Sequence, residues 1–124
     1  MSSKEIPKLY ILVRQDLPPI STGKYMVHVG HICSNLIYLG YQYDDIRKWM
    51  EYNHPIIILS VKNILEMNKY IKRWNEMYNR QAIVIPDAGF YEVQKGLVIM
   101  CGIGVMYEQD AKDIGLKRLS LYKG

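Results

Sequence analysis

Two kinds of hydrophobic pattern alternate along the chain and predict its strands and helices. Apolar runs rich in β-branched and aromatic residues are typical of strands, and they occupy residues 8–16, 54–61, 81–89, 97–105 and 116–122. Apolar residues spaced three and four apart are typical of helices, and they occupy residues 21–37, 43–53, 63–79 and 107–115. Ser21 or Thr22 is expected to cap the first helix and Asn63 the third.

The order of these elements predicts the fold class. Strands alternate with helices, and most connections are long while one is short, which favours a mixed sheet over a purely parallel one. We therefore expect an α/β fold with a single domain, in which a mixed β-sheet of four to five strands is flanked by helices on both faces. Residues 1–7 are expected to form a flexible N-terminus and residues 8–124 the domain.

The first predicted helix has a polar stripe as well as an apolar arc. At about 100° per residue, four polar side chains fall within about 60° of one another: Lys24, His28, His31 and Asn35. Seven apolar side chains form a separate arc expected to face the sheet: Tyr25, Met26, Val29, Ile32, Cys33, Leu36 and Ile37. The stripe is thus expected to point away from the core. A solvated helix face is one interpretation of it.

The same stripe suggests two chemical interpretations. Two histidines three residues apart can bind zinc, but no third ligand is near in sequence, so no metal is expected. Gly23 and Lys24 occupy the first turn, where free backbone N–H groups and the helix dipole favour an anion such as phosphate. His31, two turns beyond Lys24, can transfer a proton near neutral pH.

A carboxylate stands in the segment "IPDAGFYEV". Asp87 follows an apolar strand and precedes Ala88 and Gly89, whose small size lets a ligand or another backbone approach closely. One interpretation is a turn in which the Asp87 side chain caps its own loop. The other is that Asp87 supplies the acidic group of a site.

Composition narrows the range of partners. Hydrophobic residues make up 49% and charged residues 23% of the 124 residues, as in a folded domain. The net charge of +4 favours an anionic partner such as nucleic acid. Cys33 and Cys101 lie in apolar segments without a CxxC spacing, which indicates structural thiols in a reducing compartment. No apolar run is long enough for a membrane span, so we expect a cytoplasmic protein without a membrane partner.

Taken in order, the segments resemble the type II peptidyl-tRNA hydrolase family of archaea and eukaryotes. "GKYMVHVGH" matches the family's G-K-I-A-A-Q-x-x-H, "DAG" matches its acidic loop, and "GLVIMCGIG" matches G-x-x-T-V-L-G-I-G. The resemblance extends from about Lys8 to Tyr122. It implies hydrolysis of the ester that joins a peptide to tRNA, peptidyl-tRNA or tRNA as the partner, a possible homodimer and no cofactor.

On the matched positions, the resemblance implies that Lys24, His31 and Asp87 are catalytic. Asp87 or His31 would activate water, and Lys24 would hold the terminal phosphate or offset the oxyanion charge.

The chain also departs from the family, which has Gln at the position of His28 and R-T-Q where this chain has residues 90–92. Gly23, His28, Gly89 and Tyr91 are therefore candidate substrate-binding residues. The alternative hypotheses are an RNA-binding module without catalysis and a hydrolase for another acyl substrate.

Overall fold

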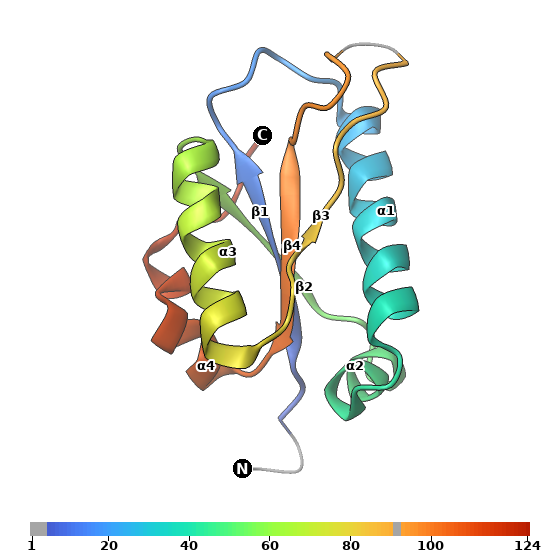
Figure 1. Cartoon of the computed structure of the whole chain (residues 1–124), viewed down its shortest axis with the longest axis vertical. Helices are drawn as coiled ribbons and strands as arrows, with labels where there is room; N and C mark the ends of the chain where they lie inside the picture. The colour runs from blue at the N-terminus through green and yellow to red at the C-terminus, as the bar shows by residue number, and fades with distance from the viewer. Residues whose placement is uncertain (1–4, 91–92) are drawn as a thin grey trace.

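The sheet of this protein lies between two layers of helices (Figure 1). The computed structural model describes residues 5–90 and 93–124. The strands are β1 (Lys8–Arg14), β2 (Ile56–Val61), β3 (Ile83–Val84) and β4 (Met100–Met106). The helices are α1 (Thr22–Gly40), α2 (Asp44–Glu51), α3 (Ile64–Tyr78) and α4 (Glu108–Ile114), followed by the short 3-10 helix η1 (Leu116–Arg118). Helices α1 and α2 cover one face and α3 and α4 the other, so the predicted α/β architecture is confirmed.

The sheet is mixed, as the connection lengths predicted. Its order is β2-β1-β4-β3. Strand β1 pairs in parallel with β2 and antiparallel with β4, and β3 pairs antiparallel with β4. Residues Leu9 to Val13 of β1 are at most 1% exposed, because this strand is covered on both faces and has neighbours on both edges.

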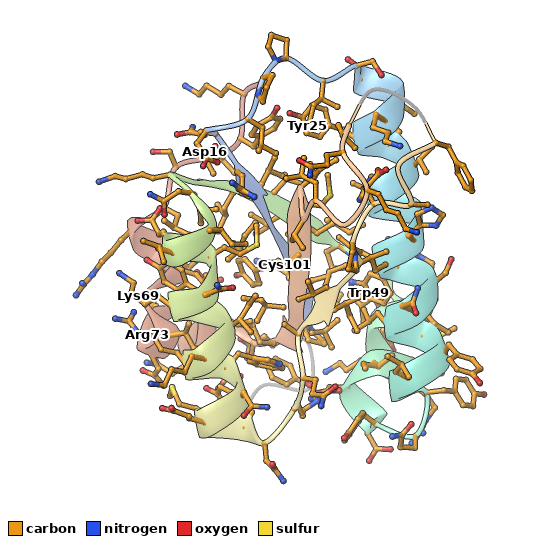
Figure 2. The ribbon with its side chains drawn as sticks, turned by 45° about the horizontal axis from the view of Figure 1, so that its top comes forward. Asp16, Tyr25, Trp49, Lys69, Arg73 and Cys101 are labelled. Atoms are coloured by element: carbon orange, nitrogen blue, oxygen red, sulfur yellow. The ribbon has the colours of Figure 1, made fainter. Side chains whose placement is uncertain are left out.

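Each face of the sheet has its own apolar core. Met67 and Trp74 of α3 are buried against one face, and Ile32 of α1 and Trp49 of α2 against the other. Figure 2 shows Trp49 between the sheet and the α1–α2 layer. Gly102 of β4 allows α1 to approach closely, because a Cβ there would lie 2.5 Å from Cγ2 of Ile32.

The predicted helix starts are confirmed. The Ser21 hydroxyl accepts a hydrogen bond from the backbone N–H of Lys24 at 3.2 Å, which caps α1. The Asn63 side chain accepts one from the N–H of Glu66 at 3.0 Å, which caps α3. Each cap satisfies an N–H that has no partner within its helix.

The prediction of a final strand over residues 116–122 is wrong. Gly115 ends α4 in a left-handed conformation, and Leu116 then turns into the core as the start of η1. The following residues run along the outer edge of β2, where only Leu121 forms a bridge, with Leu59. The N–H of Ser60 donates to the carbonyl of Ser120 at 2.9 Å, and the N–H of Tyr122 donates to the carbonyl of Ile58 at 2.9 Å.

The strand predicted over residues 81–89 is paired only at Ile83 and Val84. Pro86 has no N–H to continue the ladder. The backbone N–H of Asp87 then donates to the carbonyl of Leu97 within the connection from β3 to β4. Shortening the strand in this way frees the connection to reach α1.

Two further expectations concern the ends of the chain and membranes. The expected flexible N-terminus, residues 1–7, lies outside the described residues for positions 1–4, and β1 begins at Lys8. Across residues 5–90 and 93–124, every helix is too short or too polar to span a bilayer.

Candidate active site

Asp87 is held rigidly in the connection between β3 and β4. Its backbone N–H donates to the carbonyl of Leu97 at 2.9 Å, and its carbonyl accepts from the N–H of Gly96 at 2.8 Å. Its Oδ1 accepts a hydrogen bond from the N–H of Gly89 at 2.7 Å. Gly89 has φ of +78°, and a Cβ there would lie 2.7 Å from Cα of Lys95. The tight turn therefore needs glycine at this position.

The second carboxylate oxygen of Asp87 faces α1. Oδ2 lies 2.8 Å from Nζ of Lys24 and 2.7 Å from Nε2 of His28. Lys24 and His28 are one helical turn apart, so both side chains reach the same carboxylate. Figure 1 shows the β3–β4 connection running beside the N-terminal half of α1. We call these three residues the Lys24–His28–Asp87 cluster.

The cluster is almost withdrawn from water. The exposed fractions of the side chains are 10% for Lys24, 3% for His28 and 2% for Asp87. Burial alone raises the pKa of Asp87. The hydrogen bonds from Lys24, His28 and the N–H of Gly89, together with the Lys24 charge, outweigh burial and hold this pKa well below its ordinary range. Asp87 is therefore an anion at any physiological pH.

The stripe of α1 is oriented differently from the prediction. His28 was expected on a face turned away from the core, but it is buried beside Ile32, because the Asp87 carboxylate supplies its polar partner. His31 is exposed, and its ring lies edge-on to that of His28 at 6.2 Å between centroids. Met26, expected to face the sheet, is 68% exposed because it lies about 120° around the helix from the buried Ile32.

Of the predicted catalytic residues, the fold brings together Lys24 and Asp87. Within the described part of the chain, His31 makes neither a hydrogen bond nor an ion pair with Asp87, and His28 occupies that place. The i, i+4 spacing of Lys24 and His28 was the available signal for this contact. That spacing predicts a shared stripe, but it does not show that the Asp87 loop meets this stripe.

The other candidate residues occupy different positions around the cluster. Gly23 is exposed in the first turn of α1, where Ser21 already accepts the N–H of Lys24. Gly89 shapes the Asp87 turn. Tyr91 lies outside the described residues. Residues 5–90 and 93–124 contain no group of three or more His, Cys, Asp or Glu side chains placed to hold a metal ion.

The cluster lies just beneath the surface, and its residues line neither of two hollows in the described part of the chain. Ala88, Phe90 and His31 near it are exposed. A groove of about 1250 Å³ borders the N-terminal half of α1 and is lined in part by Pro18, Tyr25, Met26 and Tyr122. None of the three cluster residues lines this groove.

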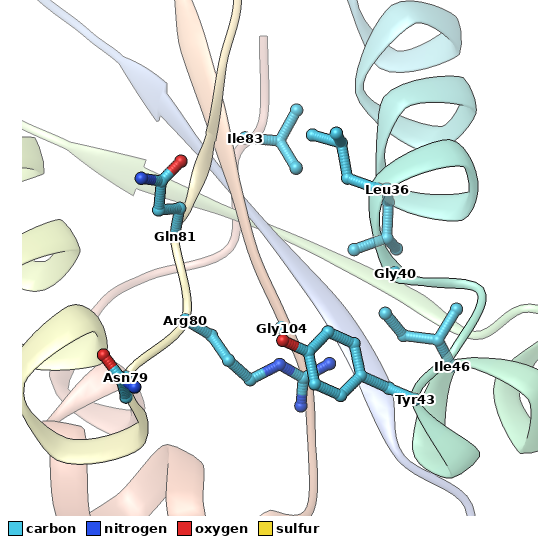
Figure 3. Close-up of a pocket in the computed structure, with 10 residues that line it drawn as sticks. Leu36, Gly40, Tyr43, Ile46, Asn79, Arg80, Gln81, Ile83 and Gly104 are labelled. Atoms are coloured by element: carbon cyan, nitrogen blue, oxygen red, sulfur yellow. The ribbon is translucent and has the colours of Figure 1, made fainter.

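The other hollow, of about 280 Å³, lies at the opposite end of α1 (Figure 3). Its lining includes Gly40, Tyr43 and Arg80. The Arg80 guanidinium is 3.9 Å from the Tyr43 ring centroid and is paired with both carboxylate oxygens of Asp45. Gly40 lies about 24 Å along the helix from Lys24 at 1.5 Å per residue. This hollow therefore belongs to a structural contact distant from the cluster.

Comparison with known proteins points to one family. The model of the family described as "Peptidyl-tRNA hydrolase PTH2" matches residues 7–122. A peptidyl-tRNA hydrolase of Sulfurisphaera tokodaii is 30% identical over 107 residues, covering 78% of this chain and 84% of the relative. One from Sulfolobus acidocaldarius is 29% identical over 106 residues, covering 78% and 85%. The chain, with its acidic loop packed against the G-K helix, therefore belongs to the PTH2 family of peptidyl-tRNA hydrolases.

Proposed function

We propose that this protein hydrolyses the ester bond of peptidyl-tRNA and releases the peptide and free tRNA. The carrying observation is the contact of 2.8 Å between Nζ of Lys24 and Oδ2 of Asp87. These two residues stand at the positions of the family's G-K and D-A-G motifs, in a chain that matches the family over residues 7–122. Their side chains come from segments more than sixty positions apart, and the fold joins them beneath an accessible surface.

The chemistry of ester cleavage suggests what each group contributes. Attack of water on the ester carbonyl places negative charge on the carbonyl oxygen, and a fixed cation lowers the barrier to that step. Lys24 supplies such a cation, held in place by Asp87 and still 10% exposed. Asp87, with its lowered pKa, is a weak proton acceptor and serves to hold Lys24.

The surroundings of the cluster fit a nucleic-acid end. The net charge of +4 attracts a polyanion. Gly23 is exposed at the N-terminus of α1, where backbone N–H groups favour a phosphate. We assign Gly23, Gly89 and Tyr91 to contacts with the substrate as part of this proposal.

The setting and assembly follow from the same proposal. Peptidyl-tRNA is a product of translation, so we place the protein in the cytoplasm.

We also propose a homodimer, which is supported by large apolar side chains exposed toward the end of α1, with Tyr38 84% and Leu39 56% exposed. Light scattering of the purified protein measures this: a mass of one chain at all concentrations would contradict the dimer.

The decisive experiment measures release of free tRNA from an N-acetyl-aminoacyl-tRNA by purified protein. We expect turnover in the wild type. In Lys24→Met and in Asp87→Asn, kcat/KM should fall at least tenfold, which is on the order of the effect of losing one charge contact in the transition state. Lys72→Met is the matched control. It removes the same charge, but at a side chain on α3 that is 77% exposed. Protein that binds tRNA in a salt-dependent manner but never releases it would favour an RNA-binding module instead.

A further inference from the structure

The Asp87 carboxylate orients a histidine as well as a lysine. Nε2 of His28 lies 2.7 Å from Oδ2 of Asp87, and both side chains are at most 3% exposed. We propose that His28 is the proton acceptor of this site, taking a proton from the attacking water through Nδ1. This inference rests on the proposed ester hydrolysis and deepens it by assigning the proton transfer.

The hydrogen bond to Asp87 fixes the form of the imidazole. Because an ionised carboxylate only accepts hydrogen bonds, Nε2 of His28 must carry the proton and donate it. In the neutral ring, Nδ1 then has an unshared electron pair and acts as a base. A carboxylate that orients an imidazole and stabilises its protonated form is the arrangement that makes histidine an effective general base.

The other ring nitrogen of His28, Nδ1, is not used in the contact with Asp87. Among the described residues, the only hydrogen-bond partner of the His28 side chain is Asp87, which uses Nε2. Nδ1 is also not one of the fully buried polar atoms without a partner, which in the described chain are Tyr10 Oη, Ser60 Oγ and Trp74 Nε1. No hydrogen bond within residues 5–90 and 93–124 therefore occupies Nδ1.

Charged groups from α1 and from the β3–β4 connection lie around His28. From its own helix, Lys24 and His31 lie beside it, and the β3–β4 connection brings Asp87. Strands β1 and β4 present apolar side chains to this layer. Lys24 and Asp87 compensate each other, and the Asp87 carboxylate then stabilises the imidazolium once it forms.

The step balances with water as the only co-reactant. The water oxygen bonds to the ester carbonyl carbon while one water proton moves to Nδ1 of His28, and the carbonyl oxygen becomes an oxyanion beside Lys24. The bond between the carbonyl carbon and the ribose oxygen then breaks, and the imidazolium returns its proton to that oxygen. The products are the peptide acid and the tRNA hydroxyl, with His28 neutral again.

The two other candidates for this role are less suited. Asp87 has a lowered pKa and three donors on its two oxygens, so it is a poor acceptor. His31 is exposed, and in the described part of the chain it has no carboxylate to orient its ring. His28, by contrast, has its ring fixed by the hydrogen bond to Asp87.

The test exchanges each histidine of the chain for glutamine and records kcat and KM for tRNA release between pH 5 and pH 9. Glutamine can keep the N–H that donates to Asp87 but cannot accept a proton. For the wild type we expect kcat to fall in acid, because a general base must be unprotonated to act. His28→Gln introduces the residue that the family carries at this position, so the variant should keep turnover but lose the acid limb of the kcat profile, with KM little changed. His54→Gln, whose ring packs on Trp49, is the control and should retain the wild-type profile.

A second readout does not depend on activity. The ¹⁵N shifts of the His28 ring should show the proton on Nε2 at neutral pH. A proton on Nδ1, an unchanged pH profile in His28→Gln, or loss of the acid limb in His31→Gln instead would each overturn the assignment while leaving the hydrolase intact. A wild type without any turnover would overturn the proposed function and this inference together.

Discussion

Replacing Lys24 by methionine should destabilise the fold through the charge it leaves behind. The Asp87 side chain is 2% exposed, and its Oδ2 lies 2.8 Å from Nζ of Lys24. With an effective dielectric constant near 20, two unit charges at that distance attract by about 6 kcal/mol. Desolvation of both groups offsets part of this, but removing one partner leaves the carboxylate buried, which costs about 3–5 kcal/mol in other proteins.

We expect the free energy of unfolding of Lys24→Met to fall by about 3 kcal/mol. This is the lower end of that range, because His28 and the N–H of Gly89 still donate to Asp87. For 124 residues the unfolding entropy is about 0.26 kcal/mol/K, so the melting temperature should fall by about 12 °C. Thermal unfolding at pH 7, followed by circular dichroism, measures this. The matched variant Lys72→Met should change the free energy of unfolding by less than about 0.5 kcal/mol.

A double variant separates the charge from the loss of packing. In Lys24→Met/Asp87→Asn the buried group is neutral, so the double variant should be at least about 1 kcal/mol more stable than the sum of the single effects. If Lys24→Met costs less than about 1 kcal/mol, or if the two effects simply add, the cluster is not the buried ion pair described above.

Three further predictions concern the Asp87 turn, the start of α1 and the core on the α3 side of the sheet. Gly89→Ala should cost about 1–3 kcal/mol, measured by urea unfolding, because φ is +78° and the new Cβ would press on the Lys95 backbone; an unchanged midpoint would contradict this. Ser21→Ala should cost about 1 kcal/mol by loss of the cap on α1, in the same assay. Burial raises the pKa of Cys101 to about 12, so iodoacetamide should label it in the native protein only after unfolding, as mass spectrometry would reveal; rapid native labelling would refute its burial.

The ionisation of Asp87 should also make the free energy of unfolding depend on pH in the acid range. Its pKa is lower in the folded than in the unfolded protein, so its contribution is present above the ordinary Asp range and is lost as the pH falls below it. The wild type should therefore lose more stability than Asp87→Asn between pH 5 and pH 3 in urea unfolding. Equal losses would show that Asp87 is not stabilised as an anion.

The sequence was sufficient for what local patterning determines. Continuous apolar runs gave β1, β2 and β4, and the spacing of apolar residues with Ser21 and Asn63 as caps gave α1 and α3. The last predicted strand failed because "LKRLSLY" has the composition of a strand, while the left-handed Gly115 and the burial of Leu116 redirect the chain. Tertiary contacts decided the outcome there.

The site could be predicted only in part for a similar reason. Lys24 and Asp87 were identified from their motifs, and the structure brings them together. Which of two histidines on one stripe meets Asp87 depends on the side from which the β3–β4 connection approaches α1. The short β3 and Pro86 determine that side. The spacing of residues along α1 therefore cannot predict which histidine contacts Asp87.

The segment that follows η1 has a consequence for how copies of this chain can associate. By donating and accepting main-chain hydrogen bonds along β2, residues 120–122 occupy one rim of the sheet, and the opposite rim offers only the two residues of β3. Neither rim presents a long unpaired ladder to a neighbour, which protects the molecule from joining strands with other copies into extended aggregates. A dimer would thus form through its helical surfaces and leave the sheet of each copy discrete.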